Sequence, residues 1–335
     1  MNRDKITIDD VAKALNVSKT TVSRAISGKG RIGAETRGRI LKYIEENNYV
    51  PSAIAKGLAQ KKTYNIGICV PSDFALMDLP FFQKCLMGVC EQAGKADYDV
   101  LVSMISEGDI SQLERLVKNR KTDGIVLTRT LTKDLPAEFL MKKQIPFVSI
   151  GSSQYQGIIQ IDNDHEAACG ELTRKLILQG TKKFALLSNN EALMVTKSRM
   201  RGFLSAMEEA GLSENAFIYD DAGDDKLKLI VERILKQDVD CILCMDDSIC
   251  IKVLDELRKR NLEIPGDIKI ASFYNSELLE RNTPSITSLK FDAHELGRVA
   301  AKTLLMMIDG EEVPRKSLLG YEISMKESTK SIESK

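Results

Sequence analysis

The stretch from Thr7 to Tyr49 reads TIDDVAKALNVSKTTVSRAISGKGRIGAETRGRILKYIEENNY. Apolar residues recur at helical spacing after Thr7, whose hydroxyl can cap a first helix that runs to about Leu15. A tight turn follows, and Ser18 is placed to cap a second helix that runs through Ile26. The stretch therefore predicts two short helices joined by a turn, the helix-turn-helix arrangement.

A third helix is predicted from Ala34 to about Asn47, and it should close the small core of this head. Ile40, Leu41 and Ile44 are placed to point into that core. Pro51 stops the helix, because proline has no amide hydrogen with which to continue it. The head is therefore expected to be all-α.

The outward face of the second helix carries hydroxyl and cationic side chains. In a helix-turn-helix this helix lies in the major groove of DNA, where arginine can donate to guanine and hydroxyls can reach bases or phosphates. Arg24 is the first candidate for reading a base. The same charges could also be ordinary solvated residues of an amphipathic helix. The predicted DNA-binding residues are Thr7, Ser18, Lys19, Thr20, Thr21, Ser23, Arg24, Ser27, Arg31, Arg37, Ala55 and Leu58.

Three runs, TIDDVAKALNVSKTTVSRAI, TRGRILKYIEENNYVP and AIAKGLA, together resemble the head of the lactose-repressor family of bacterial transcription regulators. The resemblance implies that SAIAKGLAQKK is a hinge helix that pairs across a dimer and enters the minor groove. Leu58 matches the leucine that is pushed between base pairs there, which kinks the DNA. A plain linker held by Leu58 is the alternative, because Gly57 weakens a helix.

The composition predicts sizeable cores and an uneven distribution of charge. At 335 residues and 43% hydrophobic content, the chain is long enough for two or three domains. Through Lys62 it carries 13 Lys and Arg against 6 Asp and Glu, a balance of +7, and the net charge of zero leaves −7 for the remainder. A basic head attracts phosphate. No apolar run suggests a membrane span or a signal peptide, so we expect a cytoplasmic protein without a membrane partner.

After residue 63 the pattern alternates between buried strands and amphipathic helices. NIGICVP, DVLVSMI, GIVLT, IPFVSIG and IIQID predict the strands of a first lobe. KFALLSN, AFIYD, CILCM, IKIASF and one late strand in SLLGYEISMKEST predict those of a second lobe. The alternation predicts doubly wound parallel sheets. The family resemblance, which covers nearly the whole chain, implies two Rossmann-like lobes similar to periplasmic binding proteins.

The predicted fold class is therefore an N-terminal all-α helix-turn-helix head with a hinge helix, followed by a two-lobed α/β core. The predicted boundaries are 1–50 for the head, 51–62 for the hinge helix, 63–330 for the effector-binding and dimerisation core, and 331–335 for a disordered tail. The seven cysteines resemble buried thiols, because most lie in apolar runs and no histidine stands at zinc-like spacing from them. We expect no metal and no cofactor.

Ligands of parallel sheets bind beyond the carboxyl ends of the strands, so a small molecule is expected between the lobes. In the resembled family an arginine in an RxxG pattern binds effector hydroxyls or carboxylates, and Arg199 with Gly202 fits that pattern. Asp246 is expected to face the ligand, and Asp247 to cap the helix after CILCM. The predicted effector-binding residues are Phe74, Ala75, Arg199, Asp246, Tyr274 and Phe291.

Two of these residues depart from the family pattern. Tyr274 stands where the family commonly has a sugar-binding aspartate, and Phe291 stands where glutamine is common. The two rings are either stacking surfaces for a sugar or a base, or residues of the core.

Catalytic motifs such as GxSxG, a Walker sequence or a strand-linked GxGxxG are absent from the sequence, so we expect no enzyme. The resemblance implies a transcription regulator, in the first place a repressor, that binds a pseudo-palindromic DNA operator as a homodimer. A small-molecule effector, with a carbohydrate favoured, would control it. Control by a phosphorylated protein corepressor, as in the catabolite-control members of the family, or by a nucleobase is the alternative. A sugar-binding protein without a DNA function is a more distant alternative.

Overall fold

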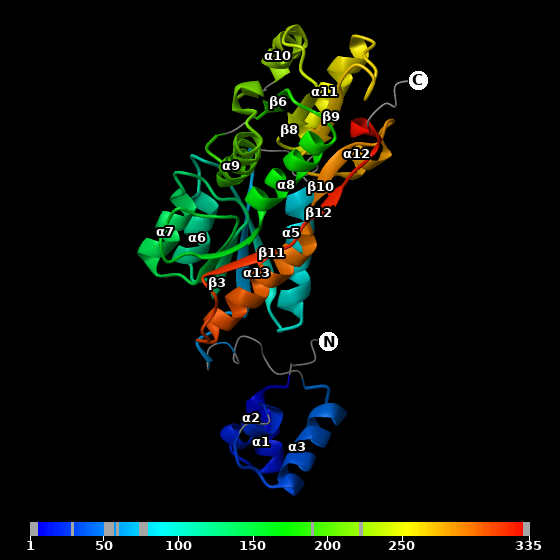
Figure 1. Cartoon of the computed structure of the whole chain (residues 1–335). Coiled ribbons are helices and arrows are strands. Elements are labelled where there is room, and N and C mark those ends of the chain that lie inside the picture. Colours follow the sequence, from blue (N-terminus) through cyan, green and yellow to red (C-terminus); the bar gives the residue numbers. More distant parts are fainter. Residues whose placement is uncertain are drawn as a thin grey trace. The chain divides into compact units, whose positions relative to one another are not determined.

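The computed structural model describes residues 6–27, 30–49, 57, 60–73, 80–188, 191–220 and 224–330, without the side chains of residues 27, 224 and 225. The chain divides into two compact units, Met1–Thr63 and Tyr64–Lys335 (Figure 1). Within the described ranges, every helix is too short or too polar to cross a lipid bilayer.

The described part of the first unit folds into α1 (Ile8–Leu15), α2 (Lys19–Ser27) and α3 (Ala34–Glu46). Its core consists of small and branched apolar side chains closed by a tyrosine: Val11, Ala12, Val22, Ala25, Ile40 and Tyr49. The inward position predicted for Leu41 is wrong, because this side chain is 42% exposed. Successive residues of a helix point about 100° apart, so Leu41 turns away from the core where Ile40 is buried.

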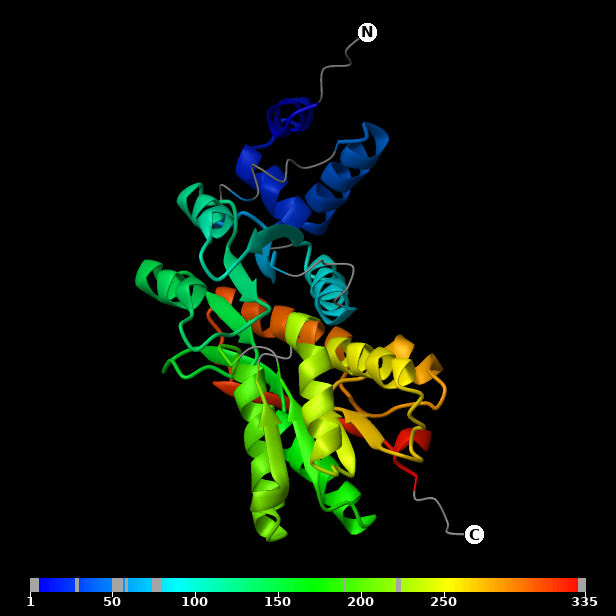
Figure 2. The ribbon, with the colours of Figure 1, turned by 90° about the horizontal axis from the view of Figure 1, so that it is seen from above.

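The second unit contains two lobes, each with a six-stranded sheet in its described part (Figure 2). The first sheet has the order β11-β5-β4-β3-β1-β2, and all its neighbouring strands are parallel. Its strands are β1 (Asn65–Pro71), β2 (Asp99–Ile105), β3 (Gly124–Leu127), β4 (Phe147–Ile150), β5 (Ile159–Asn163) and β11 (Lys316–Leu319).

Helices cover both faces of the first sheet, because alternate residues of a strand point to opposite sides. Ile66, Ile68 and Val70 of β1 share one core with α5 and α13, while Cys69 of the same strand lies in another core with α6 and α7. The covering helices are α5 (Pro80–Gly94), α6 (Ser111–Lys118), α7 (Leu135–Lys143) and α13 (Ala293–Ile308).

The second sheet has the order β12-β10-β9-β8-β6-β7, and β12 alone runs antiparallel to its described neighbour. Its strands are β6 (Phe184–Leu187), β7 (Ala216–Tyr219), β8 (Cys241–Cys244), β9 (Lys269–Ser272), β10 (Thr287–Lys290) and β12 (Glu322–Ser324). The helices of this lobe are α8 (His165–Leu178), α9 (Met194–Glu209), α10 (Asp224–Lys236), α11 (Asp247–Lys259) and α12 (Glu277–Arg281), with 3-10 turns at Ser213–Asn215 and Glu327–Thr329. The predicted doubly wound α/β core is confirmed, with β12 as the exception to its parallel order.

The chain crosses between the lobes from β5 to α8, from β10 to α13 and from β11 to β12. The prediction of one late strand is therefore wrong. Leu319 of β11 pairs with Asn163 in the first sheet, whereas Glu322 of β12 pairs with Lys290 in the second. The extended run changes sheets at residues 320–321, so the two lobes share it.

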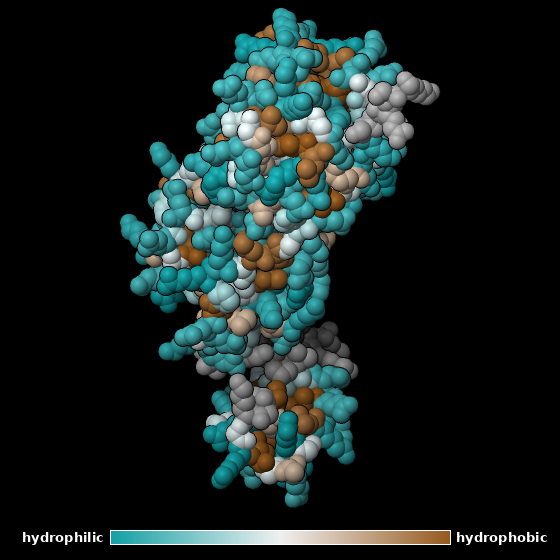
Figure 3. Space-filling view, viewed as in Figure 1, coloured by the Kyte–Doolittle hydropathy of each residue, from teal (hydrophilic) through white to brown (hydrophobic). Residues whose placement is uncertain are grey.

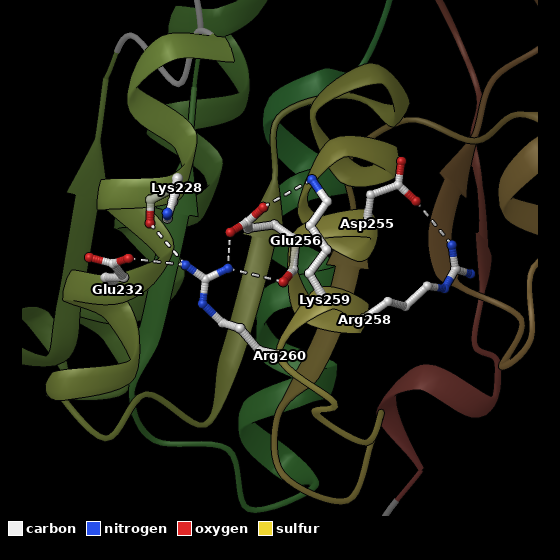
Figure 4. A network of polar contacts seen from close by, with 7 residues as sticks. All are labelled: Lys228, Glu232, Asp255, Glu256, Arg258, Lys259 and Arg260. Carbon is white, nitrogen blue, oxygen red and sulfur yellow. Dashed lines mark hydrogen bonds and ion pairs between the residues drawn. The ribbon is translucent and has the colours of Figure 1, made fainter.

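Arg260 joins α10 to the end of α11 (Figure 4). Its Nη1 donates to the main-chain oxygen of Glu256 at 3.1 Å and also binds that residue's carboxylate, while Nη2 lies 3.3 Å from Glu232 Oε1. Glu256 is buried, and Lys259 Nζ adds a second positive charge 3.3 Å from its carboxylate. These pairs offset the cost of burying the charge of Glu256.

Most of the face in Figure 3 is hydrophilic, and separate hydrophobic patches interrupt it. Exposed large apolar residues of the second unit include Met87 on α5, Val102 on β2 and Leu278 on α12. The cysteines are free thiols, and all are buried except Cys90, which is exposed and departs from the expected pattern.

Candidate functional site

The predicted caps hold the helices of the head in place. Thr7 Oγ accepts a hydrogen bond from the Asp10 amide at 3.4 Å, and the Asp10 carboxylate accepts one from the Thr7 amide at 2.9 Å. This reciprocal capping box satisfies amides that the first turn leaves open. Ser18 Oγ accepts from the Thr21 amide at 3.1 Å, so α2 also begins at its predicted cap.

The outer face of α2 is polar because its other face fills the core. Lys19, Thr20, Ser23 and Arg24 are exposed, and the same helix buries Val22 completely. Four exposed polar side chains on one capped helix form a surface that can enter a DNA groove.

Two contacts orient the cations of this surface. Lys19 Nζ lies 2.6 Å from Asp9 Oδ1, which ties α2 to α1 across their exposed faces. The stem of Arg24 passes beside Gly30, where a Cβ would lie 3.1 Å from Arg24 Cδ. Gly30 also has φ of +91°, a left-handed conformation that glycine adopts readily.

The remaining predicted DNA contacts divide by what the structure describes. Arg31 and Arg37 are exposed and add positive charge to the head, while Thr21 is partly buried. Ala55 and Leu58, and the side chain of Ser27, lie outside the described residues. The DNA contacts of all these residues stay predictions.

In the second unit, three predicted effector residues lie together around one guanidinium group. Arg199 is 7% exposed, and its Nη1 donates to the Met245 oxygen at 2.6 Å. Its guanidinium carbon lies 5.8 Å from the centroid of the Tyr274 ring and 6.0 Å from that of Phe291. The two rings are nearly parallel, at 14° and 6.3 Å between centroids. The arrangement combines a cation with two apolar ring faces.

The location of Arg199 differs from expectation. It was expected near a helix N-terminus with open amides, but α9 begins at Met194, whose amide donates to Thr130 of the first lobe at 3.2 Å. Gly202 of the RxxG pattern has a packing role, because a Cβ there would lie 2.1 Å from the main-chain oxygen of Glu166 in α8.

The roles predicted for the two aspartates must be corrected. Asp246, and not Asp247, caps α11, because its carboxylate accepts the Ile249 amide at 2.8 Å. Asp246 has the extended backbone of a cap residue, whereas Asp247 is already the first residue of the helix. Burial raises the pKa of the Asp246 carboxyl, and nearby Arg199 partly opposes this shift. The capping carboxylate thus stays within the electrostatic reach of Arg199.

Asp162 and His165 complete the surroundings of Arg199, although neither was predicted as a site residue. Asp162 Oδ1 lies 3.5 Å from His165 Nε2, and the His165 ring packs edge-on against Phe291 at 4.6 Å. Burial raises the pKa of Asp162 to about 6 and holds the pKa of His165 well below its usual value. Asp162 ends strand β5, and that strand-end position was the signal in the sequence that could have identified it.

A cavity of about 450 Å³ lies between the two lobes and shares Asp162 and His165 with the Arg199 cluster. The cluster residues Arg199, Asp246, Tyr274 and Phe291 do not line it. Both amide atoms of buried Asn163 and Nδ1 of His165 lack a hydrogen-bond partner among the described residues. The lining includes Ser152, Asp162, Asn163, Asp164, His165, Glu166, Arg174, Ser198, Arg201, Glu209 and Lys316.

Contacts between the lobes surround this region. The Thr132 amide donates to the Ala192 oxygen at 2.9 Å, beside an isolated bridge between Leu131 and Leu193. Phe81 of α5 packs edge-on against Tyr274 at 6.1 Å, a contact that was not predicted. Phe74 and Ala75 lie outside the described residues. A change in the angle between the lobes would therefore alter the walls of the site.

Comparison with known proteins assigns both units. Residues 7–52 match the family described as bacterial regulatory proteins, lacI family, and residues 173–329 match the periplasmic binding protein-like domain. The transcriptional regulator MalR of Streptococcus pneumoniae is 30% identical over 314 residues, which cover 91% of this chain and 93% of MalR.

Two solved structures have the same fold. The lac repressor dimer bound to operator and the anti-inducer ONPF has a TM-score of 0.80 at 21% identity, over 98% of this chain and 100% of that one. The CelR–cellobiose complex has a TM-score of 0.71 at 23% identity, over 96% and 99% of the two chains. The capped helix-turn-helix, the two-lobed core and the likeness to MalR agree, and this chain belongs to the lacI family of bacterial regulatory proteins, which are DNA-binding regulators of transcription.

Proposed function

We propose that this chain is a repressor that binds a pseudo-palindromic operator as a homodimer. The observation that carries the proposal is the outer face of α2, where Lys19, Thr20, Ser23 and Arg24 are exposed on a helix held by its caps. A dimer sets two such helices on related half-sites, so the symmetry of the operator should mirror that of the protein.

We further propose that a sugar bound between the lobes controls operator affinity. The support is the grouping of a buried arginine, carboxylates and two ring faces beside a cavity with unpartnered polar atoms. Sugars combine hydroxyls with apolar ring faces, so such a site suits them. The name of the CelR complex, in which cellobiose is bound on the same fold, agrees with this class of ligand.

Coupling between the two sites would run through the angle between the lobes and the hinge segment. A ligand that binds one arrangement of the lobes better shifts the equilibrium toward it. The predicted wedge residue Leu58 belongs to that segment. Leu58→Ala should reduce operator bending and affinity, and unchanged bending would remove the wedge from this proposal.

The experiment is a selection of bound duplexes from a random library, at stated salt, with and without a panel of sugars and nucleobases. Emergence of a palindrome whose recovery one sugar changes supports both parts of the proposal. Binding that depends on salt but not on sequence would contradict base reading by the head.

A matched pair of variants sharpens this test. Arg24→Ala should cost about 1–3 kcal/mol on the selected operator and relax one base position. Lys42→Ala is the control, because Lys42 is an exposed cation on α3 that pairs with Glu46 at 3.8 Å. Equal losses in both variants, or an equal loss of Arg24→Ala on random DNA, would reduce Arg24 to a phosphate contact.

A nucleobase is the second candidate effector, and the near-parallel rings of Tyr274 and Phe291 favour it. A flat base can stack on an aromatic face. The panel distinguishes the two classes, because a nucleobase and a sugar should not both change operator recovery at low concentration.

A further inference from the structure

We propose that the effector is rich in hydrogen-bond donors and carries no negative charge: an uncharged or amine-bearing sugar, and not a sugar phosphate or a sugar acid. This inference rests on the proposed effector site between the lobes and specifies its ligand class. It is carried by the charges and by the donors and acceptors around Arg199.

The charges near Arg199 are already in excess on the negative side. Asp162, Asp246 and Asp247 all act on this one guanidinium, and Asp162 is 6% exposed. His165 adds no positive charge, because its burial favours the neutral imidazole. An anionic ligand entering beside Arg199 would therefore meet three carboxylates for one cation, with little water to screen them.

The cations of the adjoining cavity do not reverse this balance. Arg201 Nε is 2.9 Å from Glu166, and Arg174 Nη1 is 3.0 Å from Glu209. Lys316 remains, and it acts on Asp162, which faces the same cavity. The stretches 74–79, 189–190 and 221–223, outside the described residues, contain two aspartates and no lysine or arginine.

The donors and acceptors give the same answer independently of net charge. An ionised carboxylate only accepts hydrogen bonds, so the aspartates require a ligand that donates. Arg199 is a donor, but its Nη1 is already bound to the Met245 oxygen. A phosphate or carboxylate group brings acceptors only, whereas hydroxyl and ammonium groups donate.

Tyr274 adds a neutral surface where the resembled family commonly has a carboxylate. Burial raises the pKa of its hydroxyl far above the usual range, so the ring and its O–H stay uncharged. With Phe291 it supplies apolar faces that suit the C–H face of a sugar ring. Recognition of hydroxyls is then assigned to Asp162 and Asp246.

The test is calorimetric titration of the full chain with matched ligands: glucose, glucosamine, gluconate and glucose 6-phosphate, then cellobiose and maltose. Operator binding of the same preparation is measured in parallel. A neutral or amine-bearing member should bind at least about tenfold more tightly than its anionic counterpart. Glucose and glucosamine separate the neutral source of donors from the cationic one.

Tighter binding of glucose 6-phosphate or gluconate than of glucose would overturn the inference and leave the sugar effector in place. If no sugar binds while operator binding persists, the sugar effector itself is wrong, and the inference falls with it. The two failures therefore give different results.

Asp246→Asn tests the cause of the discrimination. Asparagine is also a good cap residue, so α11 should keep its cap while one negative charge is lost. The preference for neutral over phosphorylated ligand should shrink by roughly tenfold. Asp134→Asn is the matched control, because Asp134 is a buried aspartate that caps α7 by accepting the Ala137 amide at 3.1 Å. An unchanged preference in Asp246→Asn would contradict the assigned role.

Discussion

Alanine at Gly202 should force helices α8 and α9 apart. An ideal Cβ there would lie 2.1 Å from the Glu166 oxygen and 3.0 Å from the Gly170 nitrogen, and both are main-chain atoms that no rotamer change can move. A carbon–oxygen contact needs about 3.3 Å, so the helices must separate locally by roughly 1 Å. The substitution therefore tests how closely the two helices pack.

The expected cost follows from two opposing effects. Overpacking of a tight interior costs about 1–3 kcal/mol, and this contact is at the severe end. Alanine returns up to about 1 kcal/mol through its higher helix propensity. A net loss of about 2 kcal/mol should lower the melting temperature of the second unit by about 4 °C, which calorimetry can resolve.

Gly94→Ala is the control in the same unit. Gly94 ends α5, and nothing lies within 4 Å of its ideal Cβ, so the melting temperature should stay the same or rise. An equal result for Gly202→Ala would refute the close packing of α8 and α9. Because α9 carries Arg199, Gly202→Ala should also weaken the effector response while the head still binds DNA.

Three further predictions concern charge and capping. Burial raises the pKa of Asp162 from 3.8 to about 6, so its ionised form opposes folding above that range and the penalty disappears as the pH falls toward 4. Asp162→Asn should therefore raise the melting temperature at pH 8 but hardly at pH 4, and an equal shift at both would contradict the raised pKa. Arg260→Met should cost roughly 2–3 kcal/mol in chemical denaturation, because it leaves buried Glu256 poorly paired. Arg281→Met, which breaks an exposed pair, should cost less than about 0.5 kcal/mol, and similar losses would show that burial is not the cause. Thr7→Ala should lower the stability of the head by about 1 kcal/mol and leave the melting of the second unit unchanged. A shift in the second transition would mean that the two units do not melt independently.

The head was predictable from sequence because its signals are local. Thr7 and Ser18 lie next to the amides they cap, and helical spacing identifies Val22 and Ile40 as buried. Leu41 was misplaced because its neighbour Ile40 is equally apolar, and only the packing of Tyr49 decides which residue points inward.

In the core, strands were easier to predict than their partners. The apolar run of β1 is recognisable in isolation, whereas the division between β11 and β12 depends on pairing with residues far away in the chain. Helix α7 was missed although its signals are present, with Asp134 as cap and Pro136 in the first turn. Its short apolar stretch resembles a loop when read alone.

The candidate site was partly predictable for the same reason. Arg199, Tyr274 and Phe291 follow strands in the sequence, so the rule for strand ends brought them together. Asp246 and Asp247 are adjacent carboxylates, and only the backbone angles decide which one caps α11. His165 was taken for an ordinary residue at a helix start, because its contact with Phe291 spans more than 120 positions of sequence.

The three crossings between the lobes have a consequence for biosynthesis. The first lobe is encoded early, yet its core requires α13, and its sheet ends with β11, which is made almost last. As the chain emerges from the ribosome, β1 and α5 must wait for about two hundred residues before their partner helix arrives. During that interval Ile66, Ile68 and Val89 lack the cover of Leu296 and Ala300. The lobe translated second can therefore close its sheet, apart from β12, while the lobe translated first is still open to chaperones.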